Sequence, residues 1–226
     1  FRLGVEYAAL ATVISQMLSV VLCMIRLIRT QDVYQVSIRE IRFDWPLLKQ
    51  IIHQGLPSGM QNSIISIANM VVQSNINSFG KMAMAGCGAY SKIEGFGFLP
   101  ITCFAMAMTT FIGQNLGARE LDRVKKGARF GILCGVGLAE AVGIGINLFI
   151  LQLIALFDRT PEVIQFGVTQ AKIVTLFYFL LSFSHVIAGI MRGAGKSMVP
   201  MLVMLISWCL IRITYVTITI HFIPDI

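Results

Sequence analysis

The chain has 226 residues, of which 56% are hydrophobic and 13% are charged. Soluble domains carry about 25% charged residues, so the composition argues against an ordinary soluble, disordered or disulfide-stapled protein. A formal net charge of +7 would suggest a nucleic-acid partner if the protein were soluble. In a membrane protein the same excess of Lys and Arg arises from loops on the cytoplasmic side.

Six apolar stretches are long enough to cross a bilayer, which requires about 20 residues. They predict an all-α polytopic membrane protein with about six transmembrane helices. Between the first two stretches, Trp45-Pro46 and the apolar residues after it predict a short amphipathic helix at the membrane surface, with a solvated loop as the alternative. The six stretches are Val5–Ile25, Leu56–Phe79, Ala83–Ile112, Phe130–Leu156, Val163–Met191 and Met198–His221.

The chain starts at Phe1 and shows neither the charged segment nor the cleavage site of a signal peptide. We therefore expect it to be part of a longer protein. Its cysteines lie in apolar runs without the spacing of a metal site, so we interpret them as small core residues rather than disulfides. They are Cys23, Cys87, Cys103, Cys134 and Cys209.

Most basic residues lie in the intervals after the first, third and fifth predicted spans. The other intervals and the N-terminus hold only Arg2, Lys81 and Arg159. By the positive-inside rule the basic side is cytoplasmic, which explains the net charge without a nucleic-acid partner. The basic residues on this side are Arg26, Arg29, Arg39, Arg42, Lys49, Arg119, Arg123, Lys125, Lys126, Arg129, Arg192 and Lys196.

Polar residues of the second predicted span fall on one face of a helix. Amides that face lipid without partners would be costly, so the stripe forms either the wall of a polar cavity or hydrogen bonds between helices. We favour the cavity because the stripe runs along the whole helix. Its members are Ser58, Asn62, Ser66, Asn69, Gln73 and Asn77.

Further polar residues lie at helical spacing within the third and fifth spans. Charged groups at membrane depth usually face the bundle interior or a water-filled cavity. For Lys172, Arg212, Glu6 and Glu140, a functional and a purely structural role remain equally open, whereas Glu94 and Lys92 lie mid-span and favour function. The residues predicted to line a substrate and cation cavity are Asn62, Asn69, Gln73, Tyr90, Glu94, Tyr178, Ser182 and His185.

The sequence contains no catalytic motif of the GxSxG or HExxH type and no phosphate-binding loop. We therefore expect a protein that is not an enzyme and that has no metal site and no cofactor. The twelve methionines could form an adaptable apolar lining, although ordinary core packing explains them equally well.

Three segments resemble motifs of the multidrug and toxic compound extrusion (MATE) transporters. Gly113-Gln114-Asn115-Leu116-Gly117-Ala118 resembles the family's hallmark at the end of a helix. Arg192-Gly193-Ala194-Gly195-Lys196 with Pro200 resembles its RGxG…P segment, and Gly55-Leu56-Pro57 resembles the start of its seventh helix. The motif positions are Pro57, Gly113, Gln114, Gly117, Arg192, Gly193, Gly195 and Pro200.

This resemblance implies a 12-helix transporter with two lobes, of which the chain would supply helices six to eleven. Residues 1–25 would be the last helix of the N-terminal lobe, and residues 26–54 the cytoplasmic linker with its amphipathic segment. Residues 55–226 would hold five helices of the C-terminal lobe. The implied function is export of drug-like, often cationic compounds across the cell membrane by antiport with Na+ or H+ through alternating access.

The chain departs from some members of the family in its acidic residues. Those members place an acid in the seventh helix about two turns after the Gly-Leu-Pro, where this chain has Ile64-Ile65-Ser66, and another in the tenth helix, where Tyr178–Ser182 contains none. The coupling acid is then either Glu94 or a residue of the missing lobe. The alternatives are a flippase for lipid-linked oligosaccharides, with Lys92 and Lys172 as its available cations, and a scaffold that transports nothing.

Overall fold

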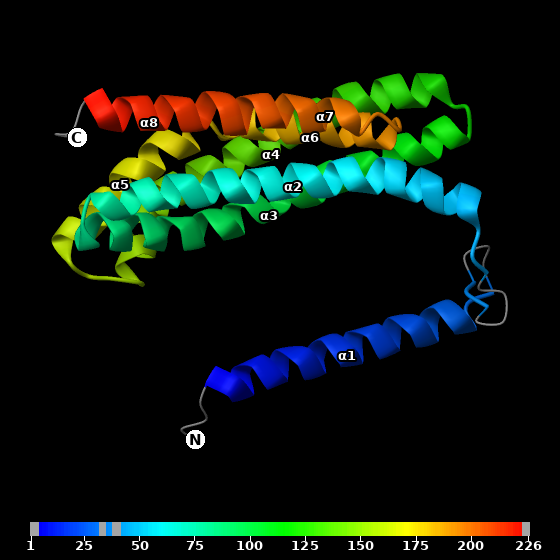
Figure 1. The fold of residues 1–226 in the computed structure, drawn as a ribbon, viewed down its shortest axis with the longest axis horizontal. Coiled ribbons are helices and arrows are strands. Elements are labelled where there is room, and N and C mark those ends of the chain that lie inside the picture. Colours follow the sequence, from blue (N-terminus) through cyan, green and yellow to red (C-terminus); the bar gives the residue numbers. More distant parts are fainter. Residues whose placement is uncertain (1–4, 32–34, 38–41, 223–226) are drawn as a thin grey trace. The chain divides into compact units, whose positions relative to one another are not determined.

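A computed structural model describes residues 5–31, 35–37 and 42–222, and all of the regular structure in these ranges is helical (Figure 1). The chain divides into two compact units, Phe1–Leu48 and Lys49–Ile226. The first unit contains α1 (Val5–Arg29). The second contains most of α2 (Trp45–Ser78) and all later helices. The predicted all-α membrane fold is therefore confirmed.

Four helices are long and apolar enough to cross a membrane. They are Ala9–Arg29 within α1, α3 (Lys81–Gly117), α4 (Leu121–Ala155) and the continuous stretch Met198–Thr219. The helices α5 (Pro161–Thr175) and α6 (Tyr178–Gly193) are long and apolar enough to form a fifth span if they are counted together. They meet at a bend of 54°, so this span is broken. With 34 residues α2 is also long enough, but its polar stripe makes it less apolar than these five.

The helix α2 is continuous from Trp45, so the separate surface helix predicted before the second span is not formed. Asp44 begins the helix, since its Oδ1 accepts a hydrogen bond from the Leu47 N–H at 3.1 Å. No residue between this cap and the span stops the helix, and Pro57 is accommodated inside it. The amphipathic segment is thus the first turns of the same helix.

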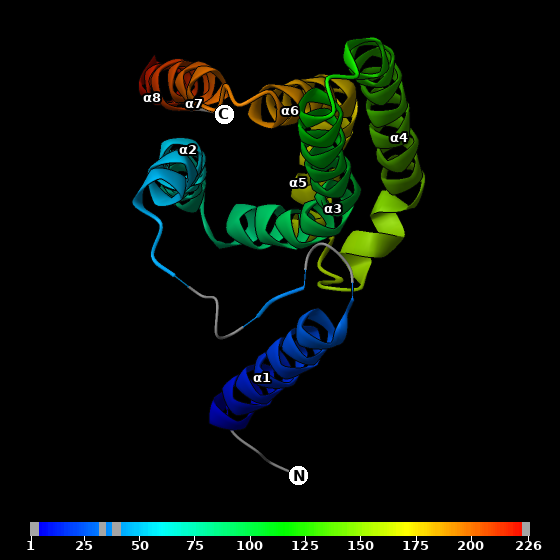
Figure 2. The same ribbon diagram turned by 90° about the vertical axis from the view of Figure 1, so that its right-hand side faces the viewer.

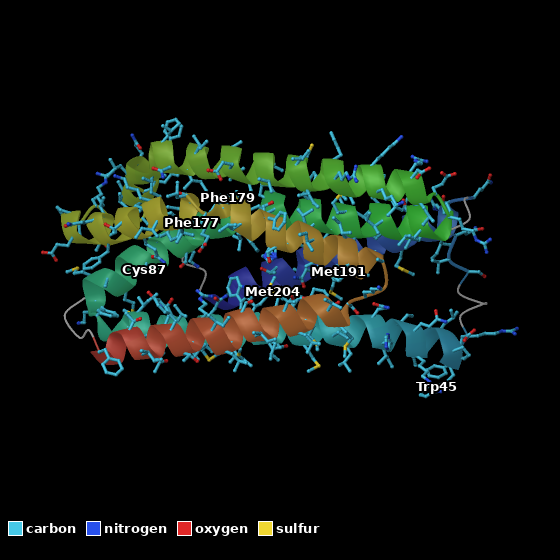
Figure 3. All side chains as sticks on the ribbon, turned by 90° about the horizontal axis from the view of Figure 1, so that it is seen from above. Trp45, Cys87, Phe177, Phe179, Met191 and Met204 are labelled. Atoms are coloured by element: carbon cyan, nitrogen blue, oxygen red, sulfur yellow. The ribbon has the colours of Figure 1, made fainter. Side chains whose placement is uncertain are left out.

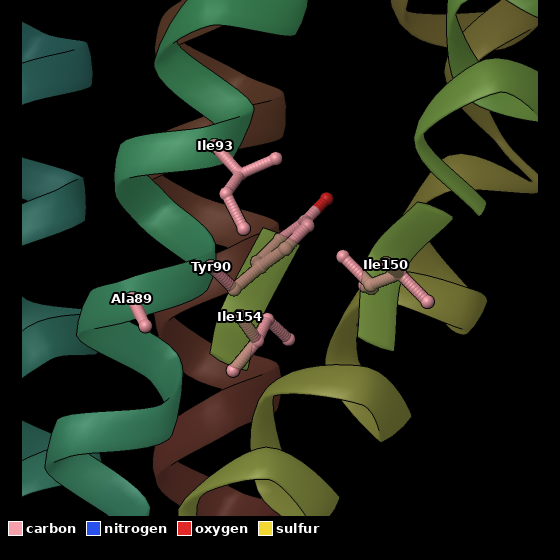
Figure 4. Close-up of a cluster of buried hydrophobic side chains, with 6 residues drawn as sticks. Ala89, Tyr90, Ile93, Ile150 and Ile154 are labelled. Atoms are coloured by element: carbon pink, nitrogen blue, oxygen red, sulfur yellow. The ribbon is translucent and has the colours of Figure 1, made fainter. Parts of the chain in front are cut away.

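Within the second unit, α3 lies among α4, α5 and α6, whereas α2 and the α7–α8 stretch lie on the side away from α4 (Figures 2 and 3). Tyr90 of α3 is fully buried and packs with Ile150 and Ile154 of α4 and Ala171 of α5 (Figure 4). Burial of such large side chains, together with glycine contacts between the backbones, holds the four helices together.

The last span is not a regular α-helix. The short helix α7 (Met198–Met204) passes into a π-helical segment, Leu205–Ile211, which continues as α8 (Arg212–Phe222). The wider turn of a π-helix shifts the register of the residues that follow, and such segments are frequent at functional sites. Here the shift comes immediately before Arg212, the only charged residue of α8.

The motif segment after α6 forms a defined helix end. Gly195 has a left-handed backbone, with φ of +77°, a conformation that glycine adopts without steric cost. Its N–H donates to the Arg192 carbonyl at 3.0 Å, and the Lys196 N–H donates to the Met191 carbonyl at 2.9 Å. These two bonds define a Schellman motif, and this turn favours the glycine of the RGxG segment at its left-handed position.

The hallmark segment after α3 ends in the same way. The Arg119 N–H donates to the Leu116 carbonyl at 3.0 Å, and the Glu120 N–H donates to the Asn115 carbonyl at 2.9 Å. The left-handed position is occupied here by Arg119, with φ of 60°, although a side chain in this conformation costs about 1–2 kcal/mol. The two segments that resemble family motifs therefore close α3 and α6 with the same turn.

We expect Arg119→Gly to stabilise the protein by about 1 kcal/mol, because glycine removes the steric cost of the left-handed conformation. The neighbouring Ala118 has φ of −78° in the right-handed region, and Ala118→Gly should destabilise by about 0.5–1 kcal/mol. Thermal unfolding of the full-length protein carrying either substitution measures the difference. A lower Tm for Arg119→Gly than for the wild type would contradict the argument.

The start of α2, the α3–α4 turn and the α6–α7 turn lie at the same end of the second unit (Figure 1). This end carries seven of the basic residues predicted to share a side of the membrane, whereas Lys81 and Arg159 lie at the opposite end. Of the other predicted residues, Arg129 lies within α4, Arg26, Arg29 and Arg42 belong to the first unit, and Arg2 and Arg39 lie outside the described residues. Those at the basic end are Lys49, Arg119, Arg123, Lys125, Lys126, Arg192 and Lys196.

Candidate functional site

The amide stripe of α2 divides into residues with and without partners on other helices. Asn62 and Gln73 are exposed, and Gln73 Nε2 donates to Asn77 Oδ1 within the same helix at 3.1 Å. Asn69 instead reaches α8, where its Oδ1 accepts a hydrogen bond from Arg212 Nη1 at 2.9 Å. The stripe is therefore polar surface along most of α2, with one link to the last span.

Arg212 is held by two partners. Besides Asn69, its guanidinium lies over the Trp208 ring, with Cζ 4.7 Å from the ring centroid. A cation–π contact of this kind contributes about 0.5–1 kcal/mol when exposed and about 2 or more when desolvated. The sequence marked Arg212 as a basic residue within a span but could not decide between its two roles, because neither partner is evident from sequence.

Glu94 lies on α3, half-buried. The basic charge that acts on its carboxylate is that of Arg212, and the two groups interact without direct ion-pair contact. A carboxylate and a guanidinium at membrane depth favour each other's charged forms. Glu94 of the predicted set therefore lies within electrostatic range of Arg212 in the last span but makes no ion pair with it.

Tyr90 and Tyr178 are enclosed by the bundle, with exposures of 0% and 1%. Their hydroxyl oxygens are 3.4 Å apart, which joins α3 to α6. Both phenols lie within electrostatic range of Glu94. Both side chains therefore stabilise the contact between α3 and α6 beside Glu94. Neither is exposed to a ligand.

Ser182 and His185 lie in helix contacts of α6. The Ser182 hydroxyl is fully buried and donates to the Gly135 carbonyl of α4 at 2.7 Å. The His185 ring packs edge-on against Phe98 of α3, with centroids 4.9 Å apart. The predicted cavity set therefore separates into exposed amides on α2, the half-buried Glu94 near Arg212, and buried or half-buried groups between α3, α4 and α6.

Two glutamines that the sequence analysis did not single out join α2 to the motif after α6. Gln54 Nε2 donates to the Gly195 carbonyl at 2.7 Å, and its Oε1 accepts from Ser197 Oγ at 2.7 Å. Gln61 Oε1 accepts a longer bond from Arg192 Nη1 at 3.4 Å. The signal in the sequence is the spacing of Gln54 and Gln61, which places them on one face of α2 two turns apart.

The other motif positions are structural or exposed. Pro57 and Pro200 are buried, whereas Gln114 and Gly117 are exposed. A Cβ at Gly193 would lie 2.4 Å from the Thr109 carbonyl oxygen, and a Cβ at Gly113 would lie 3.5 Å from the Gly193 carbonyl oxygen. These glycines let α3 and α6 cross with their backbones in contact.

We expect Gln54→Ala to loosen the α6–α7 turn by about 1–2 kcal/mol, since two hydrogen bonds are lost and the Gly195 carbonyl loses its side-chain donor. Amide hydrogen exchange of the turn in the full-length protein should then be faster. Gln50→Ala is the matched control, because Gln50 is exposed on the same helix and should leave the exchange unchanged. Equal exchange in both variants would contradict the role of Gln54.

Among the described residues, no group of three or more His, Cys, Asp or Glu side chains is placed to hold a metal ion. The long apolar helices define a polytopic α-helical membrane protein. Residues 57–218 match the model of the MatE family. The chain therefore belongs to the MATE family of transporters.

The chain is 27% identical over 206 residues to the probable multidrug resistance protein NorM of Thermotoga maritima, covering 91% of this chain and 44% of that protein. It is 25% identical to a protein of Shewanella oneidensis named FAD transporter, covering 73% of this chain and 36% of the relative. The chain thus spans less than half the length of these relatives.

Two solved structures share the fold. One is a MOP superfamily transporter from Pyrococcus furiosus, which is described as having a binding pocket of reverse polarity. It superposes with a TM-score of 0.68 at 19% identity, covering 78% of this chain and 39% of that chain. The other, a MATE protein in the straight conformation, gives a TM-score of 0.66 at 16% identity, covering 79% and 45%.

Proposed function

We propose that the full-length protein is a secondary active exporter of organic, often cationic compounds, driven by antiport with Na+ or H+ through alternating access. The observation that carries the proposal is Glu94, a half-buried acid in a membrane helix that is paired electrostatically with Arg212. Several relatives are named as multidrug resistance proteins, among them those of Thermotoga maritima and Bacillus subtilis.

In this proposal Glu94 takes up the substrate cation or the coupling ion. Arg212, held by Asn69 and Trp208, supplies the counter-charge when the site is empty. A ligand shifts the access equilibrium only if it binds the two states with different affinity. Binding at Glu94 meets this requirement if it changes the electrostatic interaction with Arg212, because Arg212 belongs to the last span and Glu94 to α3.

The exposed amides Asn62 and Gln73 would form a polar wall beside Glu94 and Arg212. Tyr90 and Tyr178 would hold α3 against α6. Ser182 and His185 would contribute to the same helix contacts. Residues 1–25 would be the last helix of the N-terminal lobe, 26–54 the inter-lobe linker, and 55–226 five helices of the C-terminal lobe. The basic end would face the cytoplasm in the cell membrane. The coupling ion needs no bound cofactor, and the protein carries out transport rather than an enzymatic reaction.

The test is transport by the full-length protein in proteoliposomes, with Na+ and H+ gradients imposed independently. Movement of a fluorescent organic cation such as ethidium should follow one of the two gradients and stop when that gradient is collapsed. A protein that moves the dye under neither gradient is not an antiporter of this kind. A scaffold gives that result, and a channel would move the dye without either gradient.

A second candidate substrate class, aromatic anions, is favoured by Arg212 and its contact with Trp208, a pairing suited to a negatively charged ring compound. One relative is named as an FAD transporter, and one related structure is described by reversed pocket polarity. FAD should then compete with the dye, and Arg212→Gln should abolish FAD movement. No competition by FAD excludes this candidate.

A further inference from the structure

The bend between α5 and α6 lies against α4 at a small cavity of about 210 Å3. Its polar lining comes from Glu140 and Asn147 of α4 and from Thr175 at the end of α5, while the rest of the lining is glycine and aliphatic side chains. This cavity is separate from the Glu94–Arg212 pair, because neither of those residues lines it. The cavity opens to the outside of the bundle, because Ile144, Leu148 and Leu176 of its lining are exposed.

Glu140 has no partner there. Its Oε2 is buried and makes no hydrogen bond in the part of the chain that the structure describes. None of the residues that line the cavity with Glu140 is ionisable. A carboxylate oxygen that is buried at membrane depth without a hydrogen-bond donor is expensive, and a cation that enters the cavity would supply the missing partner of Oε2.

The other polar side chains that line the cavity, Asn147 and Thr175, are hydrogen-bonded to each other. Asn147 Nδ2 donates to Thr175 Oγ1 at 3.0 Å, and Thr175 Oγ1 donates to the Ala171 carbonyl at 2.8 Å. These bonds use the Thr175 hydroxyl proton and one amide proton of Asn147. The amide oxygen of Asn147 is left as an acceptor, because it takes no part in either bond.

The bend exposes a further oxygen. Two carbonyls accept the backbone hydrogen bonds at the bend. The Val174 carbonyl accepts from the Phe177 N–H, and the Phe177 carbonyl accepts from the Leu180 and Leu181 N–H groups. The Thr175 carbonyl is not an acceptor of these bonds. That carbonyl faces Gly143, where a Cβ would lie only 3.0 Å from its oxygen. Carboxylate, amide and carbonyl oxygens are the ligands that hard cations prefer.

We propose that this cavity binds one monovalent cation, H+ or Na+, at Glu140, as an ion site distinct from Glu94. The ion neutralises the carboxylate and stabilises the α5–α6 bend against α4. Tyr178 links this site to the rest of the bundle, because its ring packs on Gly143 and its hydroxyl lies 3.4 Å from that of Tyr90 on α3. The ionisable side chains of α6 and α3 near this link are Tyr178, Tyr90 and Glu94, which lies within electrostatic range of both tyrosines. Lys172 on α5 is exposed.

The site is tested by labelling the full-length protein with dicyclohexylcarbodiimide, which adds to protonated carboxyl groups in apolar surroundings. Mass spectrometry should find the adduct on Glu140, with a rate that falls as the pH rises by up to about tenfold per pH unit once the group is mostly ionised. Glu162 is exposed at the start of α5 and serves as the internal control that stays unlabelled. Glu94→Gln should leave the labelling of Glu140 unchanged, which separates this site from the proposed function of Glu94.

Na+ distinguishes the two ions. If replacing choline by Na+ at constant pH slows the labelling of Glu140, the cavity binds Na+ in competition with H+. If Na+ has no effect but pH does, the ion is H+. In either case the ion that binds should raise the Tm of the wild type, because a ligand of the folded state stabilises it. The same ion should raise the Tm of Glu140→Gln less. A Tm response to pH and Na+ that is identical in wild type and Glu140→Gln overturns the proposal, whether or not Glu140 is labelled.

Discussion

Alanine at Gly86 is expected to destabilise the full-length protein relative to alanine at Gly88 by about 1–3 kcal/mol, the usual cost of overpacking. A Cβ at Gly86 would lie 2.5 Å from the Val163 carbonyl oxygen and 3.0 Å from the Gly167 nitrogen, both backbone atoms of α5. At Gly88, two residues further along α3, a Cβ meets nothing within 4 Å. Backbone atoms cannot rotate away as a side chain can, so α3 and α5 must separate.

The pair is matched because both substitutions lie on the same helix and gain the same helix propensity, about 1 kcal/mol for Gly→Ala. The difference between the two variants then isolates the helix contact. At about 2–4 °C per kcal/mol for a chain of this size, thermal unfolding should place Gly86→Ala several degrees below Gly88→Ala. Equal Tm values would mean that α3 and α5 do not approach each other as closely as in the structure.

The elements that were predicted correctly are those that depend on local composition. Long apolar runs predicted the spans that became α3 and α4, and the fifth predicted span ended at Met191, close to the end of α6 at Gly193. The bend between α5 and α6 could not be predicted, since Thr175-Leu176-Phe177-Tyr178 contains neither Pro nor Gly. It depends on Gly143 of α4, which leaves room for the Thr175 carbonyl, and a contact between two helices is not visible in either segment alone.

The candidate site was predictable in its residue types but not in its pairings. The α2 stripe has the periodicity of a single helix face, yet that periodicity does not reveal that Asn69 would pair with Arg212 from a helix more than 130 positions later. The same applies to Gln54, whose partners are Gly195 and Ser197. Polar residues within spans indicate where function can lie, and only the packing of distant helices decides which of them meet.

The Glu94–Arg212 pair gives the largest expected effect on transport. Glu94→Gln in the full-length protein should lower gradient-driven efflux at least about tenfold, within the range of typical coupling energies between two ligand sites. The amide keeps the shape of the side chain but can neither take up a proton nor neutralise a cation. Glu162→Gln is the control, because it removes an exposed acid outside this pair and should leave efflux unchanged.

Arg212 separates a coupling role of Glu94 from a purely structural one. Removing the acid alone leaves the Arg212 charge without its counter-charge at membrane depth, which is costly. The double variant Glu94→Gln with Arg212→Gln should therefore recover Tm relative to Glu94→Gln, with an interaction energy of about 0.5–3 kcal/mol in the double-mutant cycle. Driven efflux should not recover, since the carboxylate that takes up the ion is still missing. Recovery of efflux together with Tm would show that Glu94 only balances the charge of Arg212, and unchanged efflux in Glu94→Gln would refute its coupling role outright.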